Sequence, residues 1–231
     1  TVKIYDTQST EAGARSAVQQ AISDKVFIAV SLDRLTVAGA LTTALDNAGI
    51  PHLVTQLPPS YKVPDDAFVI GMDQVRHGPQ IADYMAHTLK AKKVGIVIET
   101  DPGLYAARDA FINEAKAQGM QVVHSEAVDP SANQYLSEAQ KLKNDGADAV
   151  WLYMAPNVAI NISKESQSIS YHPTWVGNNI SWGFNLALTP ASGALDGARA
   201  FSPWGGLSDP RYKVFNQVDT EGRTNQDKDI G

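Results

Sequence analysis

The segment at residues 93–111 constrains the fold of this chain more than any other. Residues 94–98, Val-Gly-Ile-Val-Ile, predict a short strand that is buried on both faces. The acidic turn at residues 99–103, Glu-Thr-Asp-Pro-Gly, leads directly into a helical pattern with apolar residues from Leu104 to Phe111. A buried strand that continues at once into an amphipathic helix is typical of a β-α-β unit, in which parallel strands are joined through a helix.

The same alternation runs along most of the chain. We predict strands at residues 2–5, 26–30, 50–54, 68–71, 94–98, 121–124, 148–153, 174–177 and 198–201. We predict helices at residues 11–23, 37–47, 77–89, 104–111, 131–145 and 157–168, and another that begins at residue 209. This order predicts an α/β fold with parallel strands, right-handed crossovers and helices on both faces of the sheet. Ligands in such folds bind beyond the carboxyl ends of the strands, so the residues that follow the strands are the candidates for function.

Composition argues against nucleic-acid binding, a transmembrane helix and cysteine chemistry. The chain has 231 residues, 19% of them charged, and a formal net charge of -6. A nucleic-acid-binding surface needs clustered basic residues, so nucleic acid is not an expected partner. No apolar run is long enough to predict a transmembrane helix, and any export signal would have to precede residue 1. The absence of cysteine excludes disulfides and thiol chemistry.

The sequence contains no motif typical of a catalytic or cofactor site. It has no G-x-S-x-G nucleophile turn, no glycine-rich phosphate-binding pattern and no H-E-x-x-H zinc motif. Its five histidines are scattered, and none has a metal-ligand partner three to five residues away. We therefore predict a protein that binds a ligand and is not an enzyme, with no cofactor and no metal.

Four segments, taken in order, resemble a known family. Residues 14–30 are similar to the family's second strand and helix, and residues 46–51, Asp-Asn-Ala-Gly-Ile-Pro, are similar to its helix end "E-E-A-G-V-P". Asp101 and Tyr105 are similar to its "D-x-x-Y-G", with Ala106 in place of the glycine, and residues 142–150 are similar to "L-K-A-A-G-A-D-A-V". The chain thus resembles the type I periplasmic solute-binding proteins of the branched-chain amino acid and amide class, which deliver small molecules to ABC importers.

The resemblance implies two lobes, each a doubly wound parallel sheet, with the first lobe incomplete. Lobe one would comprise residues 1–72 plus 202–231 and lobe two residues 73–201, so that the chain is an internal fragment. A solute held between the lobes would favour the closed state of a hinge. The resemblance also implies a bacterial protein that is periplasmic or lipid-anchored outside the cell, a membrane permease as partner, and no cofactor. The alternative is a ligand-sensing domain of a receptor or regulator, which sequence beyond both ends would distinguish.

Position after the strands, together with the resemblance, selects candidate solute-binding residues. In lobe one they are Ser31, Asp33, Arg34, Thr36, Thr55 and Gln56; in lobe two they are Tyr105, Met154, Ala155, Asn157, Asn178, Asn179 and Trp182. Several have simpler interpretations. Asp33 and Thr36 are equally expected as helix caps. Tyr105 could be a half-buried core residue and Trp182 a lid over the core.

Asn179 bears on the identity of the solute. In the amino acid receptors of this family the corresponding turn, "G-P-E-G", supplies a glutamate that meets the ligand's ammonium group, whereas residues 177–180 here read Gly-Asn-Asn-Ile. A neutral amide lacks the charge-assisted hydrogen bond, which is about twice as strong as a neutral one. The hypothesis is therefore a solute other than a simple zwitterionic amino acid: an amide, or an aromatic or carboxylate metabolite.

Overall fold

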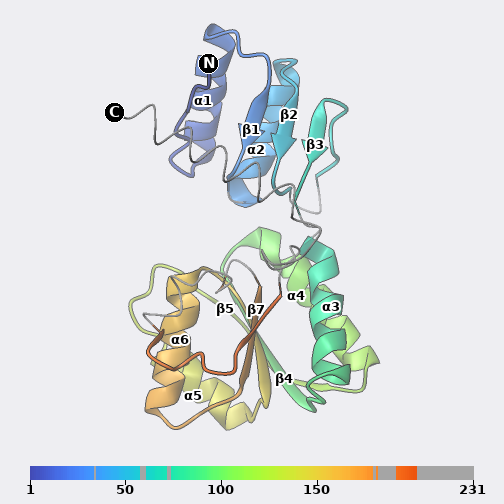
Figure 1. Ribbon diagram of the computed structural model, residues 1–231, viewed down its shortest axis with the longest axis vertical. Helices are drawn as coiled ribbons and strands as arrows, with labels where there is room; N and C mark the ends of the chain where they lie inside the picture. Colours follow the sequence, from blue (N-terminus) through green and yellow to red (C-terminus); the bar gives the residue numbers. More distant parts are fainter. Residues whose placement is uncertain (34, 58–60, 72–73, 179–180, 182–190, 202–231) are drawn as a thin grey trace, which may run out of the picture. The chain divides into compact units, whose positions relative to one another are not determined.

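The computed structural model contains two separate parallel β-sheets with helices packed along them (Figure 1). The structure describes residues 1–33, 35–57, 61–71, 74–178, 181 and 191–201. The predicted α/β class is confirmed. The helix predicted to begin at residue 209 lies outside the described residues, as does the segment 202–231 that was assigned to lobe one.

The first sheet has three parallel strands in the order β1 (Ala29–Ser31), β2 (His52–Val54) and β3 (Ala67–Val69). Its helices are α1 (Glu11–Ser23) and α2 (Leu35–Asn47). The bounds of α1 agree with the prediction because its end signals are local: the Thr10 side chain accepts a hydrogen bond from the Gly13 N–H at the start of the helix. Ala14 and Val18 of α1 pack with Val37 and Leu41 of α2 in one apolar cluster.

The opposite face of this sheet carries exposed apolar side chains. Val30 and Phe68 are 61% and 58% exposed, and both are in register with Leu53 on the central strand. A parallel sheet is normally covered on both faces, so this face is incomplete among the described residues. The strand predicted at residues 2–5 was wrong: no strand is assigned there, and Val2 and Ile4 are almost fully exposed. An apolar alternation forms a strand only where a neighbouring strand pairs with it.

The second sheet has five strands, all parallel, in the order β5-β4-β6-β7-β8. The strands are β4 (Lys93–Glu99), β5 (Gln121–Val128), β6 (Ala149–Tyr153), β7 (Thr174–Asn178) and β8 (Arg199–Phe201). Helices α3 (Gln74–His87) and α4 (Pro102–Ala117) cover one face, and α5 (Leu136–Asp145) and α6 (Pro156–Ser168) cover the other (Figure 1). This sheet is doubly wound, as predicted.

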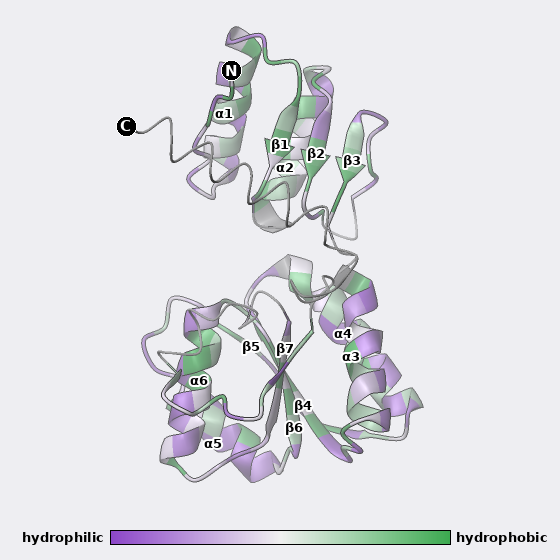
Figure 2. Cartoon of the chain, viewed as in Figure 1, coloured by the Kyte–Doolittle hydropathy of each residue, from purple (hydrophilic) through white to green (hydrophobic). Residues whose placement is uncertain are grey.

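Each face of the second sheet has its own apolar core. Ile96, Ile98 and Trp151 pack against α3 and α4, whereas Val97 and Leu152 pack against α5 and α6. The strands therefore bury both of their faces. Figure 2 shows β4 and β6 coloured largely as hydrophobic, whereas α3 and α5 carry many hydrophilic residues. Among the helices that the structure describes, none combines the length and apolar character that a membrane span requires.

Helix α5 begins five residues later than predicted. The Ser131 amide and hydroxyl both donate to Asp129 Oδ1, which closes a turn instead of starting a helix. Tyr135 then precedes the helix in a non-helical conformation, and its N–H donates to the Glu165 carboxylate of α6. The start of α5 is therefore decided by a contact with another helix, which the local sequence pattern does not contain.

Candidate functional site

The carboxyl edge of the first sheet brings four predicted residues together. The Thr55 N–H and hydroxyl both donate to the backbone carbonyl of Ser31, at 3.3 and 3.2 Å. The Gln56 side-chain amide donates to the carbonyl of Asp33 at 2.8 Å. These bonds join the segment after β2 to the segment after β1, because parallel strands end at the same edge of their sheet.

Two side chains at this edge, those of Asp33 and Ser31, differ in whether they have a hydrogen-bond partner. The Asp33 carboxylate accepts a 2.6 Å hydrogen bond from the hydroxyl of Thr7, a residue that the sequence did not single out. Ser31 is 4% exposed, and its hydroxyl has no hydrogen-bond partner among the described residues. Arg34 lies outside the described residues, and of Thr36 only the backbone, in α2, is described. The alternative of Asp33 and Thr36 as caps of α2 therefore stays open.

At the carboxyl edge of the second sheet, Tyr105 contacts both the apolar core and a basic side chain. It lies in α4, partly buried, where it packs against the core shared with α3. The Arg108 guanidinium lies over its ring, 4.8 Å from the centroid, in a cation–π arrangement. Asp101, four residues earlier, caps α4 by accepting the Gly103 N–H at 2.8 Å. Tyr105 thus has one side in the core and another in contact with a cation.

The segment after β6 supplies three predicted residues with different exposures. Met154 is 2% exposed and belongs to the core beside α6. Ala155 precedes α6 as its N-cap residue and is partly buried, and Asn157 in the first turn is exposed. Of these three, Met154 is the least accessible to a solute.

Asn178, at the end of β7, is fully buried. Its Oδ1 accepts the Ser181 N–H at 3.0 Å and lies 2.9 Å from the Ser181 hydroxyl, which also lies 2.8 Å from the carbonyl of Leu152. These contacts tie the turn after β7 to the end of β6. The neighbouring predicted residues Asn179 and Trp182 lie outside the described residues.

Two aromatic side chains of β6 are buried next to this edge. Trp151 and Tyr153 are both buried on β6 and stack with their ring centroids 5.1 Å apart. Burial raises the pKa of the Tyr153 phenol above its ordinary value, so this group stays neutral at physiological pH. The stack belongs to the apolar core that β6 shares with α3 and α4.

The sequence analysis missed Glu99, the last residue of β4. Its Oε1 accepts the Ala155 N–H at 2.6 Å and so connects the end of β4 to the segment after β6. The available signal was a carboxylate placed directly after five apolar strand residues. Within the described residues, no group of three or more His, Asp or Glu side chains is arranged to hold a metal ion.

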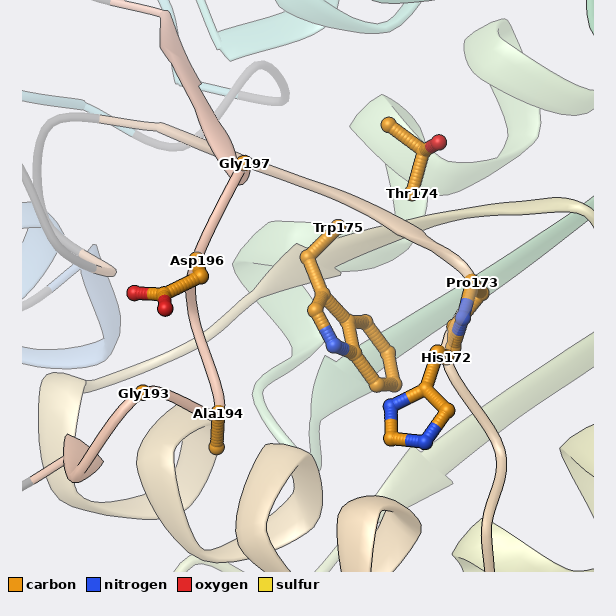
Figure 3. A pocket seen from close by; sticks show the side chains of 8 residues that line it. All are labelled: His172, Pro173, Thr174, Trp175, Gly193, Ala194, Asp196 and Gly197. Carbon is orange, nitrogen blue, oxygen red and sulfur yellow. The ribbon is translucent and has the colours of Figure 1, made fainter.

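A separate pocket lies at the amino end of β7. It has a volume of about 300 Å³. Its lining residues are His172, Pro173, Thr174 and Trp175 together with Gly193, Ala194, Asp196 and Gly197 of the turn before β8 (Figure 3). None of the predicted solute-binding residues lines it, because they follow the strands and this pocket precedes one.

The two sheets define the class of this protein. Wholly parallel sheets with polar side chains at their carboxyl edges belong to α/β proteins that bind ligands at those edges. Comparison with family models is more specific: the chain belongs to the periplasmic binding protein family, whose model matches residues 1–218. The resemblance inferred from the sequence is thereby confirmed. Members of this family are non-catalytic solute-binding proteins of ABC systems, periplasmic or extracellular.

Solved structures share this fold. A leucine-binding protein from Thermotoga maritima has a TM-score of 0.83 at 16% identity, over 94% of this chain and 63% of its own. A branched-chain amino acid transporter substrate-binding protein from Streptococcus pneumoniae, in complex with isoleucine, has a TM-score of 0.69 at 20% identity, over 76% and 51%. A solute-binding protein from Rhodopseudomonas palustris, in complex with p-hydroxybenzoic acid, has a TM-score of 0.67 at 18% identity, over 75% and 49%.

The chain therefore spans between 49% and 63% of the length of these three structures. At identities this low the likeness establishes the fold alone. A search of the curated proteins found no match to the chain.

Proposed function

We propose that the protein to which this chain belongs binds a small solute between two α/β lobes and delivers it to the permease of an ABC importer. The lobes are residues 1–72 plus 202–231, and 73–201. The observation that carries the proposal is the family match over residues 1–218, and the polar groups at both carboxyl edges support it. Closure is favoured because the solute contacts both lobes only in the closed state. A lipid anchor outside the cell belongs to the same proposal.

The proposed solute is an amide, or an aromatic or carboxylate metabolite. The support is the Gly-Asn-Asn-Ile turn at residues 177–180, which lacks a glutamate for an ammonium group. Similar folds bind chemically different solutes, since isoleucine and p-hydroxybenzoic acid each occupy one of the solved structures. The fold is therefore compatible with either class, and the side chains at the edges decide between them.

A solute panel tests this proposal. We expect the whole protein to bind at least one amide or aromatic acid more tightly than leucine or isoleucine, because the turn at residues 177–180 offers no carboxylate to their ammonium groups. Thermal-shift screening followed by calorimetry measures the order of affinities. Leucine or isoleucine as the tightest ligand would contradict the proposed solute class but not the binding function.

Tyr105 is expected to contribute to binding. Replacing it by alanine removes a partly buried ring at the carboxyl edge, and we expect the dissociation constant of the tightest panel solute to rise about tenfold, equivalent to about 1.4 kcal/mol. The matched control is Tyr84→Ala in α3, because Tyr84 is also partly buried and packs edge-on against Phe201 at 5.2 Å. Equal affinities of Tyr105→Ala and Tyr84→Ala for this solute would show that Tyr105 contributes to core packing and not to binding.

A further inference from the structure

Glu99 lies where the adjacent strands β4 and β6 of the second sheet end. Strands β4 and β6 are paired up to Ile98 and Tyr153, and Glu99 is the next residue of β4. Its carboxylate reaches across to the segment after β6, where Oε1 accepts the Ala155 N–H at 2.6 Å. The side chain is partly buried and therefore retains access to solvent at this edge.

The charge of Glu99 is not balanced by a basic side chain within the part of the chain that the structure describes. Another partly buried carboxylate of the same sheet, that of Glu126, is paired: it lies 2.5 Å from Lys141 Nζ and 3.3 Å from His124 Nε2. Glu99 forms no such ion pair among the described residues. Its only hydrogen bond there is the one from Ala155, so Oε2 keeps its capacity to accept a donor.

Helix α6 explains why an uncompensated carboxylate is stable at this position. The amino end of a helix carries a partial positive charge, which favours a nearby anion. Ala155, the N-cap residue, has no side-chain oxygen to cap the helix, and Pro156 has no N–H. Glu99, which lies in β4, therefore supplies the negative charge that the start of α6 lacks. An anionic group of a solute at this helix end would meet the like charge of Glu99.

We propose that Glu99 determines which solute group the second lobe accepts: it selects an amide N–H donor and excludes a carboxylate. The inference rests on the proposed solute-binding function and adds to it the chemistry of one side of the site. A donor gains a charge-assisted hydrogen bond to Oε2. A carboxylate at the same place meets a like charge. Any carboxylate of the solute is accordingly directed toward the first lobe.

The test compares two matched pairs of probes, 4-hydroxybenzoate with 4-hydroxybenzamide and 3-methylpentanoate with 3-methylpentanamide, by calorimetry on the whole protein. We expect the wild type to prefer the amide of each pair. Glu99→Gln keeps the side-chain length and an oxygen for the Ala155 N–H but removes the charge, and we expect it to reduce the amide-over-carboxylate preference about tenfold.

The control is Glu165→Gln. Glu165 also accepts a backbone N–H before a helix, that of Tyr135, but it does not lie at the end of a strand. We expect this variant to leave the amide-over-carboxylate preference unchanged, with both variants folded by circular dichroism. Equal preferences in wild type and Glu99→Gln would overturn the role of Glu99 while leaving solute binding intact. Failure of all four probes to bind the wild type would instead contradict the proposed solute class, and the inference would fall with it.

Discussion

Alanine in place of Leu142 is expected to lower the free energy of unfolding of the second lobe by about 3 to 4 kcal/mol. Leu142 lies in α5 with no exposed surface and packs in the core between the sheet and the α5–α6 layer. The substitution removes buried apolar surface and leaves a cavity that the close-packed surroundings fill only partly; Leu→Ala changes of this kind cost about 2 to 5 kcal/mol. Urea unfolding followed by tryptophan fluorescence measures the change.

The same substitution on the same helix provides the control for this result. Leu136 opens α5 and is 49% exposed, so truncating it removes much less buried surface. We expect Leu136→Ala to cost less than about 1 kcal/mol, because half of the lost surface was already in contact with water. Similar losses for the two variants would show that α5 does not pack on the sheet through the face that carries Leu142.

Alanine in place of Gly78 is expected to destabilise the protein by about 2 to 3 kcal/mol, although Gly78 lies inside a helix. In a solvent-exposed helix this change is favourable by about 1 kcal/mol. Here a Cβ at position 78 would lie 2.4 Å from the carbonyl oxygen of Ala107 and 2.6 Å from the backbone nitrogen of Phe111. Helices α3 and α4 touch backbone to backbone at this point, so the added methyl group must separate them and loosen the core beneath.

Gly39→Ala in α2 is the control for the Gly78 variant. Its added Cβ would meet only the ring of Tyr61, at 2.5 Å, and Tyr61 is a partly exposed side chain that can move aside. We expect the stability of Gly39→Ala to stay within about 1 kcal/mol of the wild type, because helix propensity offsets the displacement. Thermal and urea unfolding compare the two variants. A Gly78→Ala protein as stable as the wild type would contradict the close approach of α3 and α4.

The predictable part of the fold came from signals within a few residues of each element. Helix α1 matches its predicted bounds because Thr10 caps it and its apolar residues repeat with the helical period. Strands β4 and β6 were recognised because a strand buried on both faces is a continuous apolar run. The errors arose where a partner decides the structure: residues 2–5 have a strand pattern without a strand, and α5 begins only after Tyr135.

The candidate site also has a part that the sequence predicted and a part that it missed. Its position at the carboxyl ends of the strands followed from the β-α-β order, and Ser31, Asp33, Thr55 and Gln56 do lie together at one edge. Glu99 was missed because its partner, Ala155, is 56 residues away in the sequence. The buried turn that Asn178 forms with Ser181 was likewise not visible in the local pattern. The assignment of these residues to solute binding stays a prediction.

By itself, the amino-acid sequence determined the α/β class, the parallel arrangement of the strands and the family, because apolar periodicity and short motifs are local properties of the chain. The tertiary structure alone decided which polar groups are already satisfied by the protein and which remain available to a solute. Hydrogen bonds such as Glu99 to Ala155, and close contacts such as Gly78 to α4, join residues distant in the sequence. Their formation depends on packing in three dimensions, which no local pattern of residues records.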